Sequence, residues 1–203
     1  INEVKNSAFK RTVQTITYMP YFISMVVLCG LLKTFCMQDG LFAQIAVLFG
    51  GKAQNYLANP AYFRTIYVLS DIWSGIGWNS IIYLAALSSI DQEQYEAARV
   101  DGANRFQRII HVDLPAIVPT IITMLIFNCA SIMNIGFDKV YLMQNDMNID
   151  RAEVISTFVY KVGLTRGDFS FSTAAGLFQS LVSFILLVIV NKICKTVTET
   201  SLW

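Results

Sequence analysis

The chain has 203 residues, of which 55% are hydrophobic and 14% are charged, and its formal net charge is +1. A typical soluble domain is about one quarter charged, so this composition argues against a soluble globular protein. The near-neutral net charge also gives no reason to expect nucleic acid or an anionic surface as a partner.

The distribution of charge predicts an all-α, polytopic membrane protein. A helix crosses a hydrocarbon core of about 30 Å with roughly 20 residues. Stretches of this length lack Asp, Glu, Lys and Arg entirely, or contain a single acid: 12–32, 114–137, 169–191, and 65–90 with only Asp71. The alternative, a soluble helical protein, would need core helices that are unusually long and free of charge.

In chain order, the first predicted helix covers 12–35 and contains Pro20, which removes a backbone hydrogen bond and predicts a kink. A loop at 37–64 follows. Its apolar middle, 40–51, is too short to span, so it lies on the membrane surface or packs on other helices. A turn at Asn59-Pro60 precedes the second predicted helix, 65–90.

A polar segment at 91–113 then leads to a third predicted helix, 114–137. After a second polar loop, 138–168, in which 154–162 has the spacing of a short amphipathic helix, a fourth helix covers 172–195. We treat 1–203 as a single transmembrane domain. Basic residues divide almost evenly between the two sides of the membrane, so the positive-inside rule gives no orientation.

The segment 91–113 contains the heptapeptide EAARVDG and predicts two short helices joined by a bend. Asp91 is suited to an N-cap, and Gln94 completes a capping-box pattern. Gly102 stands where a left-handed residue ends a helix, and a second helix can follow at 104–111. From these residues alone, a solvated connector between two spans is an equally good interpretation.

The spacing of this segment resembles a known signature. Glu96-Ala97-Ala98, Gly102 and Val112-x-Leu114-Pro115 match the EAA motif of permease subunits of binding-protein-dependent ABC importers. The stretches Pro20–Ser24, Trp73–Trp78 and Asp101–Ala103 look like the oligosaccharide and polysaccharide branch of that family. The resemblance implies the type I, maltose-permease-like fold. Because such permeases usually have six spans, we expect the four-helix chain to be the C-terminal portion of a longer protein.

The resemblance also implies a mechanism and a set of partners. The EAA loop would be cytoplasmic, with the loops 37–64 and 138–168 extracytoplasmic, and it would dock on a separate ATPase subunit. Gly50-Gly51-Lys52 lacks the remaining residues of a phosphate-binding loop, so ATP and magnesium would belong to the partner ATPase, and this chain would be no enzyme and hold no cofactor or metal. The expected coupling residues are Glu96, Ala97, Ala98, Arg99, Asp101, Gly102, Arg105, Leu114 and Pro115.

A candidate substrate path follows from the one acid inside a predicted span. A charged residue within a membrane helix is a functional hypothesis by default. Gly75 and Trp78 follow Asp71 on the same helical stripe, and together they would offer hydroxyl hydrogen bonding and ring stacking to a sugar. By resemblance to maltose-type permeases, Tyr21 and Asn128 join this set. Alternatively, Asp71 pairs with a cation of a partner chain, and Trp78 is an interfacial anchor.

The sequence thus predicts a multi-pass permease of the bacterial plasma membrane that imports carbohydrate. It would work with a second permease, two ATPase subunits, an extracytoplasmic solute-binding protein and membrane lipid. The alternative is an ABC permease for another solute, such as amino acids or phosphate. An intramembrane hydrolase would need motifs such as H-E-x-x-H or G-x-S-x-G, which the chain lacks, and a channel would leave the EAA spacing unexplained.

Overall fold

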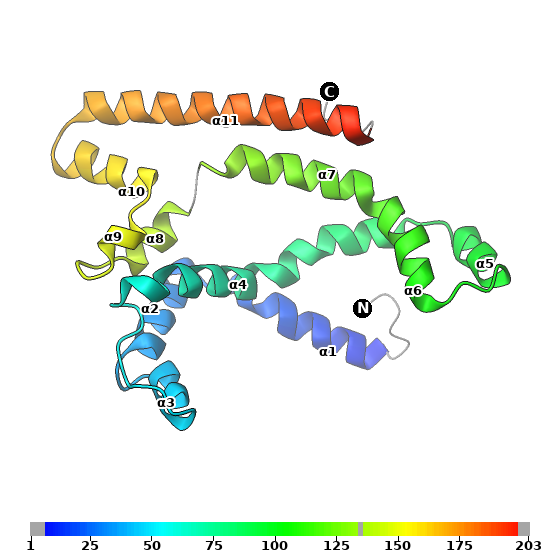
Figure 1. The fold of residues 1–203 in the computed structure, drawn as a ribbon, viewed down its shortest axis with the longest axis horizontal. Helices are drawn as coiled ribbons and strands as arrows, with labels where there is room; N and C mark the ends of the chain where they lie inside the picture. Colours follow the sequence, from blue (N-terminus) through cyan, green and yellow to red (C-terminus); the bar gives the residue numbers. More distant parts are fainter. Residues whose placement is uncertain (1–6, 134–135, 199–203) are drawn as a thin grey trace. The chain divides into compact units, whose positions relative to one another are not determined.

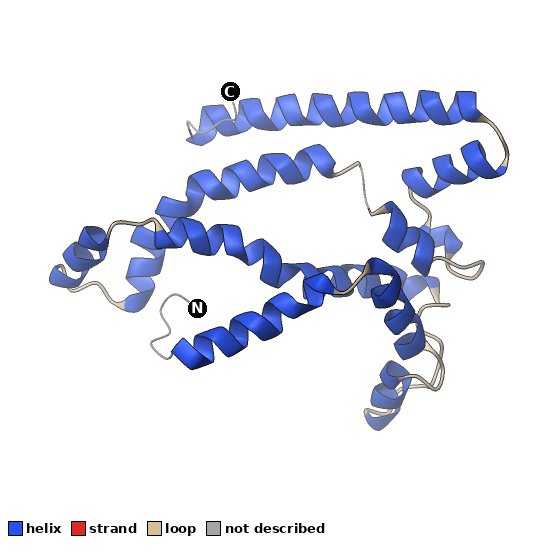
Figure 2. Cartoon of the chain, turned by 180° about the vertical axis from the view of Figure 1, so that it is seen from behind, coloured by secondary structure: helices blue, strands red, loops and turns tan. Residues whose placement is uncertain are grey.

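A computed structural model describes residues 7–133 and 136–198. These residues form helices joined by short loops, with no strand in either described range (Figure 1; Figure 2). They divide into two compact units. The first unit comprises Ile16 and the described residues before it, Gly77–Met133, and the described residues from Leu181 onward. The second unit comprises Thr17–Ile76 and the described residues up to Ser180 that follow Met133.

The second unit is built from short helices and one end of each of two long ones. Its core contains residues of α2, α8 and α9 together with the first turn of α4, in a cluster that includes Leu28, Phe63 and Met143. Its helices are η1 (Met19–Phe22), α2 (Met25–Cys36), α3 (Leu41–Leu48), the start of α4 (Pro60–Ser88), α8 (Phe137–Met143), α9 (Ile149–Ala152), α10 (Ile155–Tyr160), the π-helix η3 (Lys161–Thr165) and the start of α11 (Phe169–Thr198).

The first unit contains the predicted polar segment. Its core joins α7 and α11 through Ile122, Ile126 and Cys194. The helices of this unit are α1 (Ser7–Tyr18), the end of α4, α5 (Gln92–Val100), α6 (Arg105–Arg108), the π-helix η2 (Ile109–Asp113), α7 (Leu114–Ser131) and the end of α11.

The four cysteines are free thiols. Cys29, Cys36 and Cys194 are buried and Cys129 is half-buried, which agrees with a role as small apolar side chains.

The first predicted helix, 12–35, differs from the structure because Pro20 interrupts it rather than kinking it. α1 ends at Tyr18, and the 3-10 turn η1 contains Pro20, whose carbonyl accepts a hydrogen bond from Ile23 N at 3.2 Å. Ser24 then begins α2 as a new N-cap, accepting a bond from Val27 N at 3.3 Å. A residue with its own cap starts a separate helix, so the predicted single span is two helices.

Three stretches of the described residues are long and apolar enough to cross a membrane. They are Met25–Leu48, Arg105–Ser131 and Phe169–Thr196, with mean hydropathies of 1.4, 2.0 and 2.2. The predicted span 65–90 corresponds to α4, which has 29 residues but is not among the three. At 1.5 Å per residue α4 is about 44 Å long, so its length suffices, and its polar residues, including Asp71 and Asn79, lower its hydropathy.

The later predicted elements also change in detail. The predicted helix 114–137 is α7 up to Ser131, while residues 134 and 135 lie outside the described residues, and Phe137 already belongs to α8. Pro119 is accommodated inside α7. The polar loop 138–168 is largely helical, and the short helix predicted at 154–162 is present as α10.

Candidate functional site

The helix α5 begins at the predicted cap and carries the EAA residues. The Asp91 carboxylate accepts a hydrogen bond from Glu93 N at 3.1 Å, and Glu93 places a negative charge in the first turn, where the helix dipole favours it. The capping box predicted at Asp91 and Gln94 instead forms at the next helix. There Asn104 N donates to Gln107 Oε1 at 2.8 Å, and Gln107 N donates to Asn104 Oδ1 at 2.9 Å.

The end of α5 is a Schellman motif centred on Gly102. The φ angle of Gly102 is 75°, in the left-handed region, as the sequence predicts. Ala103 N donates to Ala98 O at 2.9 Å, and Gly102 N donates to Arg99 O at 3.1 Å, which satisfies two carbonyls at the helix end. The chain therefore leaves α5 through a defined bend rather than a loose loop.

The predicted second helix, 104–111, is longer than expected and continues into the next span. α6 ends at Arg108, η2 follows at once, and α7 begins at Leu114 without an intervening loop. Within η2, His111 Nδ1 lies 3.0 Å from Gln107 O. The segment after the bend is thus one run of helical turns that leads directly into an apolar stretch long enough to span a membrane.

A side-chain hydrogen bond joins α5 to this run of turns. The Tyr95 hydroxyl donates to Asp113 Oδ1, and both side chains are half-buried. Asp113 is the last residue of η2, directly before Leu114 and Pro115 at the start of α7. Sequence reasoning missed this pair because the two residues lie 18 positions apart and no local rule relates them.

A groove of about 470 Å³ lies between α5 and the α6–η2 turns. The small residues Ala97, Ala98 and Gly102 form part of its wall. Arg108, which is not among the predicted coupling residues, also lines the groove, and its Nε forms no hydrogen bond within the described residues. Ala98 is half-buried, and the other predicted coupling residues are exposed: Glu96, Ala97, Arg99, Asp101, Gly102, Arg105, Leu114 and Pro115.

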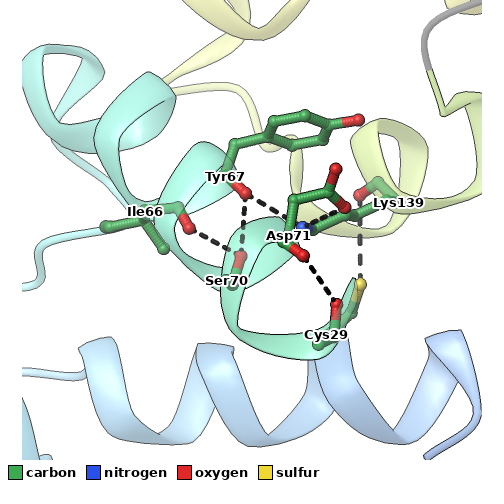
Figure 3. A network of polar contacts seen from close by, with 7 residues as sticks. Cys29, Ile66, Tyr67, Ser70, Asp71 and Lys139 are labelled. Atoms are coloured by element: carbon green, nitrogen blue, oxygen red, sulfur yellow. Dashed lines mark hydrogen bonds and ion pairs between the residues drawn. The ribbon is translucent and has the colours of Figure 1, made fainter. Parts of the chain in front are cut away.

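The acid predicted for the substrate path is part of a second polar cluster, in the second unit (Figure 3). Lys139 Nζ of α8 lies 3.0 Å from Asp71 Oδ1 and donates to Tyr67 O at 2.9 Å. The same ammonium stands 4.5 Å from the centre of the Tyr67 ring, within the range of a cation–π interaction. Asp71 therefore pairs with a cation of its own chain, where the sequence left a partner-chain cation as the alternative.

The two members of this ion pair differ sharply in exposure. The Lys139 side chain is 1% exposed, whereas the Asp71 side chain is 59% exposed. Burying an ammonium is costly unless it is paired and hydrogen-bonded, and here both the carboxylate and the Tyr67 carbonyl satisfy it. Ser70 Oγ lies 2.6 Å from Ile66 O and 3.0 Å from Tyr67 O, so its single proton is directed mainly to the Ile66 carbonyl. A lysine in a polar loop gives no local sign of burial, so the sequence did not reveal this residue.

The other residues predicted for the substrate path lie on three elements. Gly75, half-buried, and Trp78, exposed, follow Asp71 along α4. Tyr21 is exposed in η1, and Asn128 is exposed in α7 with its carbonyl accepting a bond from Ser131 Oγ at 3.1 Å. Their part in a path stays a prediction.

Comparison with known proteins places the chain in a family. It belongs to the binding-protein-dependent transport system inner membrane components, which it matches over residues 2–197. The fold is that of a type I ABC importer permease. A bacterial alginate ABC transporter, solved in complex with an alginate pentasaccharide-bound periplasmic protein, has a chain 38% identical to this one with a TM-score of 0.95, covering 99% of this chain and 70% of that one.

Two relatives from Bacillus subtilis (strain 168) are 41% identical over 204 residues. They are protein LplB and the polygalacturonan/rhamnogalacturonan transport system permease protein YteP. Each match covers 100% of this chain and 64% of the relative. The chain thus spans somewhat less than two thirds of the length of these relatives.

Proposed function

We propose that this chain is a transmembrane permease subunit of an ATP-driven carbohydrate importer. It would form the translocation path with a second permease, receive substrate from an extracytoplasmic binding protein, and be driven by two cytoplasmic ATPase subunits through alternating access. ATP and magnesium would be held by the ATPase subunits. Family membership and the match to an alginate transporter support this assignment.

The shape of the EAA loop is the observation that carries the coupling role. α5 presents Glu96 and Arg99 to solvent, the Schellman bend at Gly102 sets its direction, and α6, η2 and α7 continue as consecutive turns. A push on α5 is thereby transmitted to an apolar helix through the bend and the Tyr95–Asp113 hydrogen bond. A merely solvated connector would need none of these features.

The names of the relatives favour carbohydrate over amino acids or phosphate. One relative at 41% identity is named for polygalacturonan and rhamnogalacturonan, and the transporter at 38% identity imports the acidic polysaccharide alginate. We therefore extend the proposal to oligosaccharides that contain uronic acids. The groups available to bind their hydroxyls are those predicted on α4, α7 and η1.

The test is ATP-coupled uptake by the complete importer. The protein is purified with the permease, ATPase and binding protein encoded beside it, and reconstituted with ATP inside liposomes. Wild-type protein should accumulate trigalacturonate or maltotriose only when ATP is hydrolysed. Glu96→Lys should abolish both sugar uptake and the stimulation of ATP hydrolysis by the sugar-loaded binding protein. The substitution reverses an exposed charge on the proposed docking helix.

A matched control is available on the predicted opposite side of the membrane. Asp39→Lys makes the same charge reversal at an exposed residue of the 37–64 segment and should leave uptake unchanged. Equal effects of the two substitutions would argue against coupling through α5. Uptake of an amino acid or phosphate in place of either sugar would overturn the assignment to carbohydrate.

A further inference from the structure

The ion pair between Lys139 and Asp71 has a buried cation and an exposed anion, which suggests a role beyond joining α4 to α8. The ammonium is enclosed, with one proton directed to Asp71 Oδ1, one to the Tyr67 carbonyl, and the Tyr67 ring beside it (Figure 3). The carboxylate, by contrast, faces outward, and its Oδ2 forms no hydrogen bond within the residues that the structure describes. The chain thus offers a hydrogen-bond acceptor to solvent and hides the charge that balances it.

We infer that Lys139 is a specificity-determining positioning residue that neutralises Asp71, so that anionic sugars can pass a hydrogen-bonding carboxylate. This inference rests on the proposed function and on Asp71 lining the path. Lys139 is buried and does not touch the substrate. It acts through Asp71, by fixing one carboxylate oxygen and cancelling the net charge that an approaching uronate would meet.

The physical argument compares an ion pair with a lone carboxylate. A pair of opposite charges about 3 Å apart has a field that falls off much faster than that of a single charge. An unbalanced charge about 10 Å away, at an effective dielectric constant of about 20, changes the occupancy of an anion by roughly tenfold. A charge of the same sign as the ligand is a common means of excluding that ligand from a binding path. The negative charge of Asp71 must therefore be balanced if the ligand is an anion.

The competing explanation is that the pair only ties two helices together. Cys29 Sγ lies 4.0 Å from Lys139 O, and α2 packs on α8, so Lys139 does stand in a packed environment. The two explanations differ in one respect. A broken structural tie impairs uptake of neutral and anionic sugars alike, whereas an unbalanced charge changes the KM for the anion and leaves the KM for a neutral sugar nearly unchanged.

The experiment measures ATP-driven uptake of trigalacturonate and of neutral maltotriose by the reconstituted importer carrying Lys139→Met, Asp71→Asn, or both. Lys139→Met should raise the KM for trigalacturonate about tenfold. Asp71→Asn should lower that KM, because the buried ammonium is left unbalanced. The double variant should return the KM to within about threefold of wild type. Each preparation is checked for thermal stability and for co-purification of the ATPase subunits.

The outcomes separate the inference from the proposed function. If wild-type importer takes up neither trigalacturonate nor maltotriose, the proposed function fails. If it takes up maltotriose alone, the function stands and the inference is overturned. The inference is overturned in favour of a structural tie if Lys139→Met raises the KM for maltotriose as much as the KM for trigalacturonate. It is also overturned if the double variant is as impaired as Lys139→Met, or if the single and double variants both lose the ATPase subunits. An Asp71→Asn variant with a raised KM for trigalacturonate overturns it as well, even where Lys139→Met does not fold.

Discussion

Gly102 gives the sharpest prediction, because its structure isolates a single energetic term. Its φ angle is 75°, and a Cβ built there meets no heavy atom within 4 Å. Gly102→Ala therefore adds no clash, and its cost is the penalty of about 1–2 kcal/mol for holding an L-residue in the left-handed region. Gly102→Val should cost more because of its β-branch, and Gly102→Asn less, since Asn visits this region readily.

A cost of this size is enough to change the population of the bend. A change of 1–2 kcal/mol alters an equilibrium by about 5- to 30-fold. If residue 102 relieves the strain by leaving the left-handed conformation, the hydrogen bonds from Ala103 N to Ala98 O and from residue 102 N to Arg99 O are lost as well. We expect uptake per ATP hydrolysed to fall in the order Gly, Asn, Ala, Val at position 102.

The control is a glycine in ordinary helical backbone. Gly176 lies within α11, and a Cβ there also meets nothing within 4 Å. Gly176→Ala should retain uptake and favour the helix by about 0.5–1 kcal/mol. The assay is sugar uptake and ATP hydrolysis measured on the same proteoliposomes. If Gly102→Val transported as well per ATP as Gly176→Ala, the bend could not be what directs α5, and the reasoning would be refuted.

Three further predictions concern single contacts. Asp91→Ala should destabilise α5 by about 0.5–2 kcal/mol by removing its cap, seen as faster amide hydrogen exchange in α5, whereas unchanged exchange would contradict the cap. Tyr95→Phe should raise the ATP hydrolysed per sugar imported, because it deletes only the hydroxyl that reaches Asp113; an unchanged ratio would show that this bond transmits nothing. Asn148→Ala should lower the melting temperature at a cost of about 1–3 kcal/mol, because the buried amide donates to Leu57 O at 2.8 Å and Met143 O at 3.2 Å. A melting temperature equal to that of wild type would mean that water replaces both bonds.

The features predicted well from sequence are those that obey local rules. A cap acts on the next few backbone amides and a left-handed glycine on the preceding turn, so Asp91 and Gly102 could be assigned without knowing the fold. The short helix α10 followed from its apolar spacing in the same way. The family could be named because the EAA spacing combines several positions within one such local segment.

The features that were missed depend on distant residues or on small differences in energy. Lys139 meets Asp71 across 68 positions, and Tyr95 meets Asp113 across 18. Neither lysine nor tyrosine in a polar loop indicates such a partner. At Pro20, a kinked helix and a broken helix differ by whether Ser24 caps a new start, and hydropathy does not distinguish these outcomes. The π-helical turns have no residue type of their own, so periodicity alone could not reveal them.

The π-helix η2 changes which residues before and after it lie on the same side of the helix. Leu114 N donates to Ile109 O, a bond that encloses one residue more than an α-helical bond does. That residue shifts the helical phase by about 100°, so a wheel drawn continuously from Arg105 to Ser131 assigns the wrong side to everything after Asp113. Deleting one residue within Ile109–Asp113 would convert the turn to regular helix and rotate α7 about its own axis relative to α6. A single-residue deletion in a relative could therefore present another side of α7 to the proposed path while leaving the predicted coupling residues from Glu96 to Arg105 in place.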